Sequence, residues 1–481
     1  MKKRIVSILL TAAMLLSLIC AATVAGKAAY KIGDTDGDGT VTILDATEIQ
    51  RFLADLIKYF PAEMLVPEET EAPTELPTQA PTVKPTEAPT QPPTEAPTPD
   101  DEVTKVKDNI TVYFSNNLNW SKVNAYIYNN ASGTSMNAWP GKAMTFVKTN
   151  TEGEKVYSVT VDVTKYDRII FNNGTDQTTD TPITKASSGY FIIKNPNTNI
   201  YDKFNGKYLA GVYPYGQNGE GTVKTVSMNY PDGYKKKVYI WLPEGYNAAD
   251  KSKKYPVLYM CDGQNLFGQA STLSGYEWEC DESVLSLMQN GGDGIIVVGV
   301  EAGSPSDRRD HELTPNIGTT VSFAGPSYVN GGGKVFSDFV VNTVIPYVES
   351  NYNTNSIRGI AGSSSGGIEA FYIGIEHMDK FRYIGALSPA FILYDQTTWN
   401  NYLKTKDFSG DVPRIYFFCG NSAQDQLEQA LYPNAIAMEG WLKKLGYPAS
   451  KMTTVTDGEA THSEGFWAIY FPEMLAYGLE V

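Results

Sequence analysis

Two patterns of hydrophobic and polar residues divide the chain from residue 105 onward. Between 105 and 205, apolar and polar residues alternate over short runs separated by Asn, Gly and Thr. The runs are 110–114, 123–128, 156–163, 168–171 and 190–193. A period of two is typical of strands with one buried face, and several such strands at close spacing predict a small β-sandwich.

Between 219 and 481 the pattern changes, because apolar runs of strand length alternate with stretches of helical periodicity. The predicted strands are 237–242, 256–260, 294–300, 357–361, 383–386 and 415–418. The predicted helices are 282–287, 335–351, 367–376 and 426–444. This alternation predicts one large α/β domain, a mostly parallel sheet with helices on both faces.

The first 29 residues have the pattern of a secretory signal peptide. A basic start at Lys2, Lys3 and Arg4 precedes an apolar run over 5–19, and small residues follow it. The run is shorter than the roughly 20 apolar residues that a membrane span needs, which disfavours an uncleaved anchor. We expect a secreted, extracellular protein, with no membrane contact after cleavage.

Residues 30–62 contain a candidate calcium loop. Carboxylates and a carbonyl fall at the spacing that Ca²⁺ prefers, and the expected ligands are Asp34, Asp36, Asp38, Thr40 (through its carbonyl) and Asp45. A solvated acidic turn is the alternative. Helical spacing follows over 49–56, so that a small helical calcium-binding segment is predicted. Residues 33–56 resemble one dockerin repeat, which implies a cohesin scaffold as partner, although dockerins usually have two repeats.

The linker and the overall composition limit the remaining possibilities. Residues 63–104 repeat Pro-Thr units, a composition that favours an extended spacer. The chain has 481 residues and a net charge of −15, which argues against a nucleic-acid partner. The cysteines that remain after cleavage are too few for a disulfide framework, and we expect Cys261 and Cys419 to be buried free thiols.

A candidate nucleophile lies in the sequence Gly362-x-Ser364-x-Gly366, between a predicted strand and a predicted helix. This spacing is typical of a nucleophile elbow, in which a sharp turn lifts the serine hydroxyl above the sheet edge. Three histidines are present in the chain, and His462 is the one that lies far after Ser364 in the order that α/β-hydrolases use. His377, at the predicted end of the elbow helix, is interpreted as structural.

The remaining catalytic groups are assigned from their places after strands. Asp425 is the expected acid of the triad, with Glu428 as the alternative. The backbone N–H groups of Ser365 and Gln264 are the expected oxyanion donors. Asp262, two residues before Gln264, is interpreted as a structural carboxylate. Such a triad needs no cofactor.

The second region resembles the esterase D-like family of esterases, which is related to carbohydrate esterase family 1. The matching segments are 255–259, 262–267, 312–315, the elbow, 378–381 and 462–464 with Trp467. The resemblance implies an α/β-hydrolase fold and hydrolysis of carboxylic esters through an acyl-enzyme.

The first region resembles the family 26 carbohydrate-binding modules, which bind starch. The resemblance rests on 113–114, Trp120, 125–128, 139–141, 170–174 and 177–178. It implies that Tyr126 or Tyr128 stacks on sugar rings together with Trp139, and that Gln177 binds hydroxyls. The alternative is that these aromatic residues belong to the core.

Together these patterns predict a secreted, modular carbohydrate esterase. It would hydrolyse acetyl or feruloyl esters on a polysaccharide and be held on a starch-like glucan. An acyltransferase with the same triad is one alternative, and a non-catalytic polysaccharide-binding scaffold component is another.

Overall fold

The computed structural model describes residues 106–195, 200–201, 203–213, 215, 221–267, 276–303, 306–321, 328 and 330–481. The predicted signal peptide, the calcium loop with its five ligands and the Pro/Thr-rich linker lie outside the described residues. Residues Pro97–Val481 form one compact unit, which contains both of the regions that the sequence patterns distinguish.

The first region is a β-sandwich, as its alternation predicts. One sheet has the order β13-β8-β1-β5-β4 and the other has the order β3-β2-β6-β7. Their strands are β1 (Asn109–Asn116), β2 (Asn124–Tyr128), β3 (Lys142–Ala143), β4 (Thr145–Thr149), β5 (Lys155–Asp162), β6 (Arg168–Asn172), β7 (Thr181–Pro182), β8 (Gly189–Ile192) and β13 (Ala210–Tyr213). In β2, Ala125 and Ile127 are buried in the core, while Tyr126 and Tyr128 point to the outer face.

The sandwich extends beyond the predicted boundary at residue 205. Strand β13 pairs with β8 and completes the larger sheet, so that this domain continues to Tyr213. Two short hairpins precede β13, made by β9 (Lys194–Asn195) with β10 (Ile200–Tyr201) and by β11 (Lys203–Phe204) with β12 (Lys207–Tyr208). A strand of two residues is too short to show an alternation of apolar and polar residues. The sequence pattern therefore placed the end of the domain at residue 205, before its last strand.

The second region contains an eight-stranded sheet in the order β14-β15-β17-β16-β18-β19-β20-β21. The strands are β14 (Thr222–Asn229), β15 (Lys235–Leu242), β16 (Tyr255–Cys261), β17 (Ile296–Val300), β18 (Thr354–Ser363), β19 (Tyr383–Leu387), β20 (Arg414–Gly420) and β21 (Met452–Asp457). Strands β16 to β21 are parallel to one another, whereas β14 and β15 are antiparallel additions at one edge. The predicted mostly parallel sheet is therefore confirmed.

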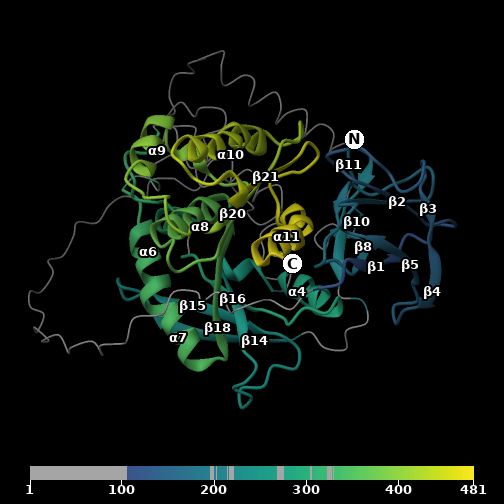
Figure 1. Cartoon of the computed structure of the whole chain (residues 1–481), viewed down its shortest axis with the longest axis horizontal. Coiled ribbons are helices and arrows are strands. Elements are labelled where there is room, and N and C mark those ends of the chain that lie inside the picture. The colour runs from purple at the N-terminus through teal and green to yellow at the C-terminus, as the bar shows by residue number, and fades with distance from the viewer. Residues whose placement is uncertain are drawn as a thin grey trace, which may run out of the picture. The chain divides into compact units, whose positions relative to one another are not determined.

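Helices cover both faces of this sheet (Figure 1). The helices are α4 (Cys280–Gln289), α5 (Ser306–Glu312), α6 (Gly333–Phe339), α7 (Ile345–Asn351), α8 (Ser364–Glu376), α9 (Gln396–Leu403), α10 (Gln426–Lys444) and α11 (Glu464–Leu479). Ile384 of β19 approaches Gly374 of α8, whereas the next residue, Gly385, faces Met474 of α11. Because side chains alternate along a strand, α8 and α11 lie on opposite faces.

Helix α11 is apolar on all sides, and 14 of its 16 residues are buried. It contacts β19 and β20 of the eight-stranded sheet and also β7 and β13 of the sandwich, so that both domains cover it. A helix that is hydrophobic all round has no 3.6-residue period, which is why its sequence predicted no amphipathic helix.

Candidate active site

The elbow serine lies where the sequence predicts, at the junction of β18 and α8. Ser364 has a φ of 55°, which is unusual for a residue with a side chain and is typical of a strained elbow. A Cβ on Gly362 would lie 2.4 Å from the carbonyl oxygen of Gly366, so that no larger residue fits there. The close approach of these two glycines is what allows the sharp turn.

His462 lies in the loop after β21, and its ring contacts a carboxylate. Its Nδ1 is 3.2 Å from Oε1 of Glu428, a residue in the first turn of α10. The edge of the ring packs against Trp467, with centroids 4.9 Å apart. Imidazole and carboxylate therefore form the pair that a general base and its orienting acid require.

The assignment of Asp425 as the acid beside the imidazole has to be corrected. Asp425 caps α10, because its Oδ1 accepts hydrogen bonds from the backbone N–H groups of Leu427 and Glu428. Its Oδ2 accepts a hydrogen bond from the backbone N–H of His462 at 2.7 Å. Asp425 thus holds the histidine backbone, while Glu428, the alternative, holds the ring.

Three further side chains surround the carboxylate of Glu428. The hydroxyl of Ser388 donates to Oε1, the thiol of Cys419 donates to Oε2 at 3.2 Å, and the indole N–H of Trp467 donates to the Ser388 oxygen at 3.0 Å. Burial by itself would raise the pKa of Glu428, but the hydrogen bonds and charge of His462, with Ser388 and Cys419, lower it below its ordinary value. The site therefore favours an ionised Glu428.

The serine and the histidine share one edge of the sheet. Strands β18, β19, β20 and β21 are parallel neighbours, so their carboxyl ends meet at the same edge. The backbone N–H of Ala390 donates to the Ser364 carbonyl oxygen at 3.0 Å, and Ser388, two residues earlier, contacts Glu428. A continuous set of contacts thus joins the elbow to the Glu428–His462 pair.

The expected oxyanion donors lie in segments next to the elbow. Gln264 is in the short helical turn Gly263–Asn265 after β16, and Ser365 is the second residue of α8. A Cβ on Gly366 would lie 2.9 Å from Oδ2 of Asp262, so the turn containing Gln264 packs against the elbow. The Gln264 side chain accepts from the N–H of Ala302 and donates to Asp262, which fixes the turn.

Several other interpretations from the sequence are confirmed. Asp262 is buried and makes a two-point ion pair with Arg309 at 2.7 and 2.8 Å, a structural role. His377 follows α8 and its Nε2 is 3.1 Å from the Ser337 hydroxyl. The cysteines after residue 105 are buried and free; they are Cys261, Cys280 and Cys419.

The sequence reasoning missed Ser388, and it missed that Cys419 contacts the acid. Ser388 lies directly after β19 with a φ of 42°, in a segment without a recognisable motif. A signal for Glu428 did exist, because Asp425-x-x-Glu428 has the spacing of a capping box. Here Asp425 caps α10, but Glu428 contacts His462 instead of reaching back, and the Asp425 N–H donates to the carbonyl oxygen of Ser422.

The sandwich presents the predicted aromatic residues together on its surface. The ring centroid of Tyr126 is 5.5 Å from that of Tyr128 and 5.5 Å from that of Trp139. Trp139 is 46% exposed, which excludes the core interpretation for this residue. Gln177 lies nearby, bridged to Asn172 at the end of β6. These aromatic residues form what we call the platform: Tyr126, Tyr128 and Trp139.

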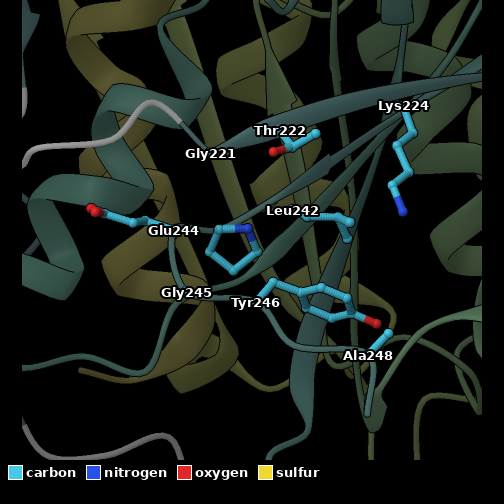
Figure 2. Close-up of a pocket in the computed structure, with 9 residues that line it drawn as sticks. Gly221, Thr222, Lys224, Leu242, Glu244, Gly245, Tyr246 and Ala248 are labelled. Carbon is cyan, nitrogen blue, oxygen red and sulfur yellow. The ribbon is translucent and has the colours of Figure 1, made fainter. Parts of the chain in front are cut away.

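A pocket of about 400 Å³ lies at another part of the second domain (Figure 2). Its lining includes Lys224, Leu242 and Tyr246. Trp241 of β15 pairs with Val297, near the start of β17, so this pocket lies at the amino edge of the parallel strands. Ligands of open α/β sheets bind at the carboxyl edge, where Ser364 lies, which argues against this pocket as the catalytic site.

The arrangement defines the class of the second domain. A serine at a strand-to-helix elbow and a histidine–carboxylate pair at the same sheet edge are the parts of an α/β serine hydrolase. The model of the family described as Putative esterase matches residues 232–477, more than half of the chain, and the chain belongs to this family. The model of Starch-binding module 26 matches residues 112–182, within the sandwich.

Individual proteins show more distant similarity. YbbA of Bacillus subtilis (strain 168), described as an uncharacterized protein, is 22% identical over 247 residues, which are 50% of this chain and 90% of that protein. An IroE-like serine hydrolase from Shewanella oneidensis has a TM-score of 0.42 and 21% identity, and the match covers 52% of this chain and 79% of that one. A CE1 ferulic acid esterase from Anaeromyces mucronatus has a TM-score of 0.42 and 18% identity, over 56% and 96%.

Among the helices of the described residues, none combines the length and the apolar character needed to cross a bilayer.

Proposed function

We propose that this protein is a secreted carbohydrate esterase that hydrolyses acetyl or feruloyl esters on a polysaccharide. The observation that supports the mechanism best is the contact between His462 Nδ1 and Glu428 at the sheet edge that carries the Ser364 elbow. Ser364 is the proposed nucleophile, His462 the general base and acid, and Glu428 the orienting carboxylate.

In the first half of the reaction, Ser364 Oγ attacks the ester carbonyl carbon and its proton passes to His462 Nε2. The carbonyl oxygen becomes an oxyanion, which the backbone N–H groups of Gln264 and Ser365 stabilise. When the intermediate collapses, the bond to the alcohol oxygen breaks and His462 returns the proton to this oxygen. The sugar hydroxyl is released, and the acyl group stays on Ser364.

In the second half, water replaces the sugar. His462 removes a proton from water, whose oxygen attacks the acyl carbon. Collapse of the second intermediate releases the acid and returns the proton to Ser364 Oγ. Throughout, Glu428 accepts the hydrogen bond from Nδ1–H and so keeps Nε2 free of a proton at the start of each half.

The sandwich supplies the proposed attachment to a starch-like glucan. Sugar rings have apolar C–H faces that lie flat on aromatic rings, and the platform offers such rings on the surface. Gln177, bridged to the end of β6, is the proposed hydrogen-bonding partner of sugar hydroxyls. We expect Trp139→Ala to reduce retention in amylose-containing gels, while retention in xylan gels serves as the reference.

The N-terminal residues are assigned from their sequence. Secretion is proposed from residues 1–29, and a structural Ca²⁺ from Asp34, Asp36, Asp38, Thr40 and Asp45. Attachment to a cohesin scaffold is proposed from the resemblance of residues 33–56 to a dockerin repeat. A calcium titration of the protein and of an Asp34→Ala variant would test the metal site, since only the parent should bind at this loop.

The esterase activity is tested by removing the nucleophile. Ser364→Ala should lower turnover of p-nitrophenyl acetate by more than about 10³-fold, because the acyl-enzyme can no longer form. Ser363→Ala, which removes the neighbouring hydroxyl, is the matched control and should retain activity. Equal turnover by Ser364→Ala and the parent would refute the assignment.

The acyl group is tested with a panel of acetylated and feruloylated oligosaccharides. The parent should release acetate or ferulate from at least one of them. If none is hydrolysed while p-nitrophenyl acetate is, the protein is an esterase for another substrate class.

A further inference from the structure

The outer face of the sheet β3-β2-β6-β7 carries both the platform and a contact with the catalytic domain. Tyr126 pairs with Ile170 and Tyr128 pairs with Arg168 across antiparallel strands, so these side chains share one face. The guanidinium of Arg168 is 3.2 Å from Glu473 of α11 and lies over the ring of Tyr470. The face that presents the sugar-stacking rings therefore continues directly into the esterase domain.

Polar side chains connect the edge of the platform to the loop that carries His462. Lys207 of β12 is 2.8 Å from Glu459, which lies three residues before His462. Burial lowers the pKa of Lys207, but the hydrogen bond to Glu459 and the charges of Asp180, Glu459 and Asp457 raise it above its ordinary value. Asp180 lies beside Tyr128, whose pKa is raised by burial and then by the Asp180 charge. We call Asp180, Lys207 and Glu459 the bridge cluster.

The β11–β12 hairpin contacts both the loops of the proposed catalytic pair and the segment that carries Gln177. Asn205 accepts a hydrogen bond from Gln424, in the segment that leads to Glu428, and Phe204 packs against Phe466 at the start of α11. Toward the platform, the backbone N–H of Tyr208 donates to the carbonyl of Gln177 at 2.9 Å. The hairpin thus joins the predicted sugar-binding amide to the loops of the catalytic pair.

The short stretch of chain between Glu459 and His462 limits the distance from the bridge cluster to the proposed catalytic histidine. Glu459 and His462 are three residues apart, so their Cα atoms are at most about 11 Å from each other. The bridge cluster combines a cation with two carboxylates, groups that hydrogen-bond sugar hydroxyls, and it adjoins aromatic rings that stack on sugar faces. Aromatic faces followed by polar side chains, ending beside a histidine, suit an extended carbohydrate chain.

We propose that the platform, the bridge cluster and the esterase site form one binding surface for a single chain, so that the substrate is an acylated α-glucan whose own sugar rings lie on Trp139 and Tyr126. This inference rests on the proposed function, since it names the substrate of the same triad. It differs from an anchoring role, in which the sandwich holds one polymer while the esterase acts on another. The acyl group to be cleaved is on a glucose unit a few rings from the platform.

Kinetics on soluble substrates test this surface. Acetylated maltoheptaose, acetylated glucose and p-nitrophenyl acetate are compared as substrates of the parent chain. One binding surface predicts that kcat/KM for the acetylated maltoheptaose exceeds that for acetylated glucose by about tenfold or more, because only the longer chain reaches the platform. Unmodified maltoheptaose should compete with the acetylated maltoheptaose, because both would occupy the same surface.

Variants separate the binding surface from the catalytic machinery. Trp139→Ala should raise KM for acetylated maltoheptaose by about tenfold, a larger effect than on p-nitrophenyl acetate, which is too small to reach the platform. Phe146→Ala is the matched control, because this residue is 52% exposed on β4 of the other sheet. Its substitution should leave the kinetics with both acetylated maltoheptaose and p-nitrophenyl acetate unchanged. Lys207→Gln should also raise KM for the oligosaccharide while retention on granular starch persists.

The outcomes distinguish a failure of the single binding surface from a failure of the esterase function. If Trp139→Ala loses retention on granular starch but keeps the parent's kinetics on acetylated maltoheptaose, the sandwich is only an anchor and the single surface is refuted. If the parent fails to turn over p-nitrophenyl acetate, the esterase function itself is refuted. Equal rates with acetylated maltoheptaose and an acetylated cello-oligosaccharide would also contradict the assignment of an α-glucan.

Discussion

Asp425 and Glu428 lie three residues apart at the start of α10, and their carboxylates contact different atoms of the same histidine. Asp425 accepts from the backbone N–H of His462, and Glu428 contacts ring atom Nδ1. Both residues are acidic, both follow β20, and both lie within reach of one loop. Asp425 is the N-cap of α10, whereas Glu428 lies in its first turn. This difference in position along the helix decides which carboxylate contacts the imidazole.

The two carboxylates can be separated by isosteric substitution. Glu428→Gln should lower kcat for p-nitrophenyl acetate by about 10³-fold, because the amide no longer stabilises the imidazolium or fixes its tautomer. Asp425→Asn should change kcat by less than about tenfold, since a capping oxygen remains, and should cost about 1 kcal/mol of stability, because the amide nitrogen cannot accept from the His462 N–H. Steady-state kinetics with thermal unfolding measure both effects, and the reverse ranking would restore Asp425 as the acid.

Cys419 offers a second test at the residue scale, because its thiol donates to the other oxygen of Glu428. Cys419→Val removes this donor, so the pKa of Glu428 should rise and the acid limb of the pH profile of kcat/KM should move to higher pH. Cys419→Ser keeps a donor and should keep the parent profile. A shift of equal size in both variants would show that only packing at this site matters.

At the scale of elements, the predictability of the chain depends on whether each segment has a period. Strands β15 to β20 were predicted within a few residues, and helix α10 within its bounds, because their patterns are regular, whereas β14 and the parallel edge strand β21 were not predicted. Helix α11, with apolar residues on all sides, and the two-residue strands of the hairpins have no such pattern. The elbow and His462 were found from motif and chain order, whereas the choice of Glu428 needed the helix start in three dimensions.

Helix α11 also carries the ion pair that joins it to β6. Arg168 and Glu473 are both largely buried, at 7% and 21% side-chain exposure. Arg168→Met should lower the free energy of unfolding by about 2–4 kcal/mol, because it leaves the Glu473 carboxylate buried without its cation. The double variant Arg168→Met/Glu473→Gln should recover much of this loss. Denaturant titrations measure both, and additive losses would argue against coupling between these residues.

At the scale of the whole molecule, the sandwich and the hydrolase meet over a buried interface. Glu279, at the start of α4, accepts a hydrogen bond from the backbone N–H of Val212 in β13 at 2.7 Å. Asn290 donates to the carbonyl oxygens of Lys185 and Ser187 on the sandwich side. Because backbone groups of one domain are satisfied by side chains of the other, we expect the two domains to unfold in one transition.

The interface also predicts how stability changes with pH. Burial, and then the charges of Glu277 and Asp281, raise the pKa of Glu279 to about 8, although the Val212 hydrogen bond lowers it. A raised pKa means that the folded state holds the proton more tightly than the unfolded state does. The stabilisation is therefore complete below the unfolded value of about 4.5 and is lost as the pH rises toward 8.

Unfolding measured between pH 5 and pH 8 tests this expectation. Glu279 should contribute a loss of about 1 kcal/mol per pH unit over this range. Glu279→Gln keeps an oxygen that accepts from Val212 and should make the dependence on pH shallower. An unchanged slope in this variant would assign the effect to other buried acids, such as Glu282 or Glu369.

The double burial of α11 has a practical consequence for protein engineering. In this protein, removing the sandwich would expose part of the apolar helix α11, whose first residues follow the proposed catalytic residue His462. A change of the polymer bound is therefore better attempted by substituting side chains on the outer face of the sheet β3-β2-β6-β7, with the sandwich left in place.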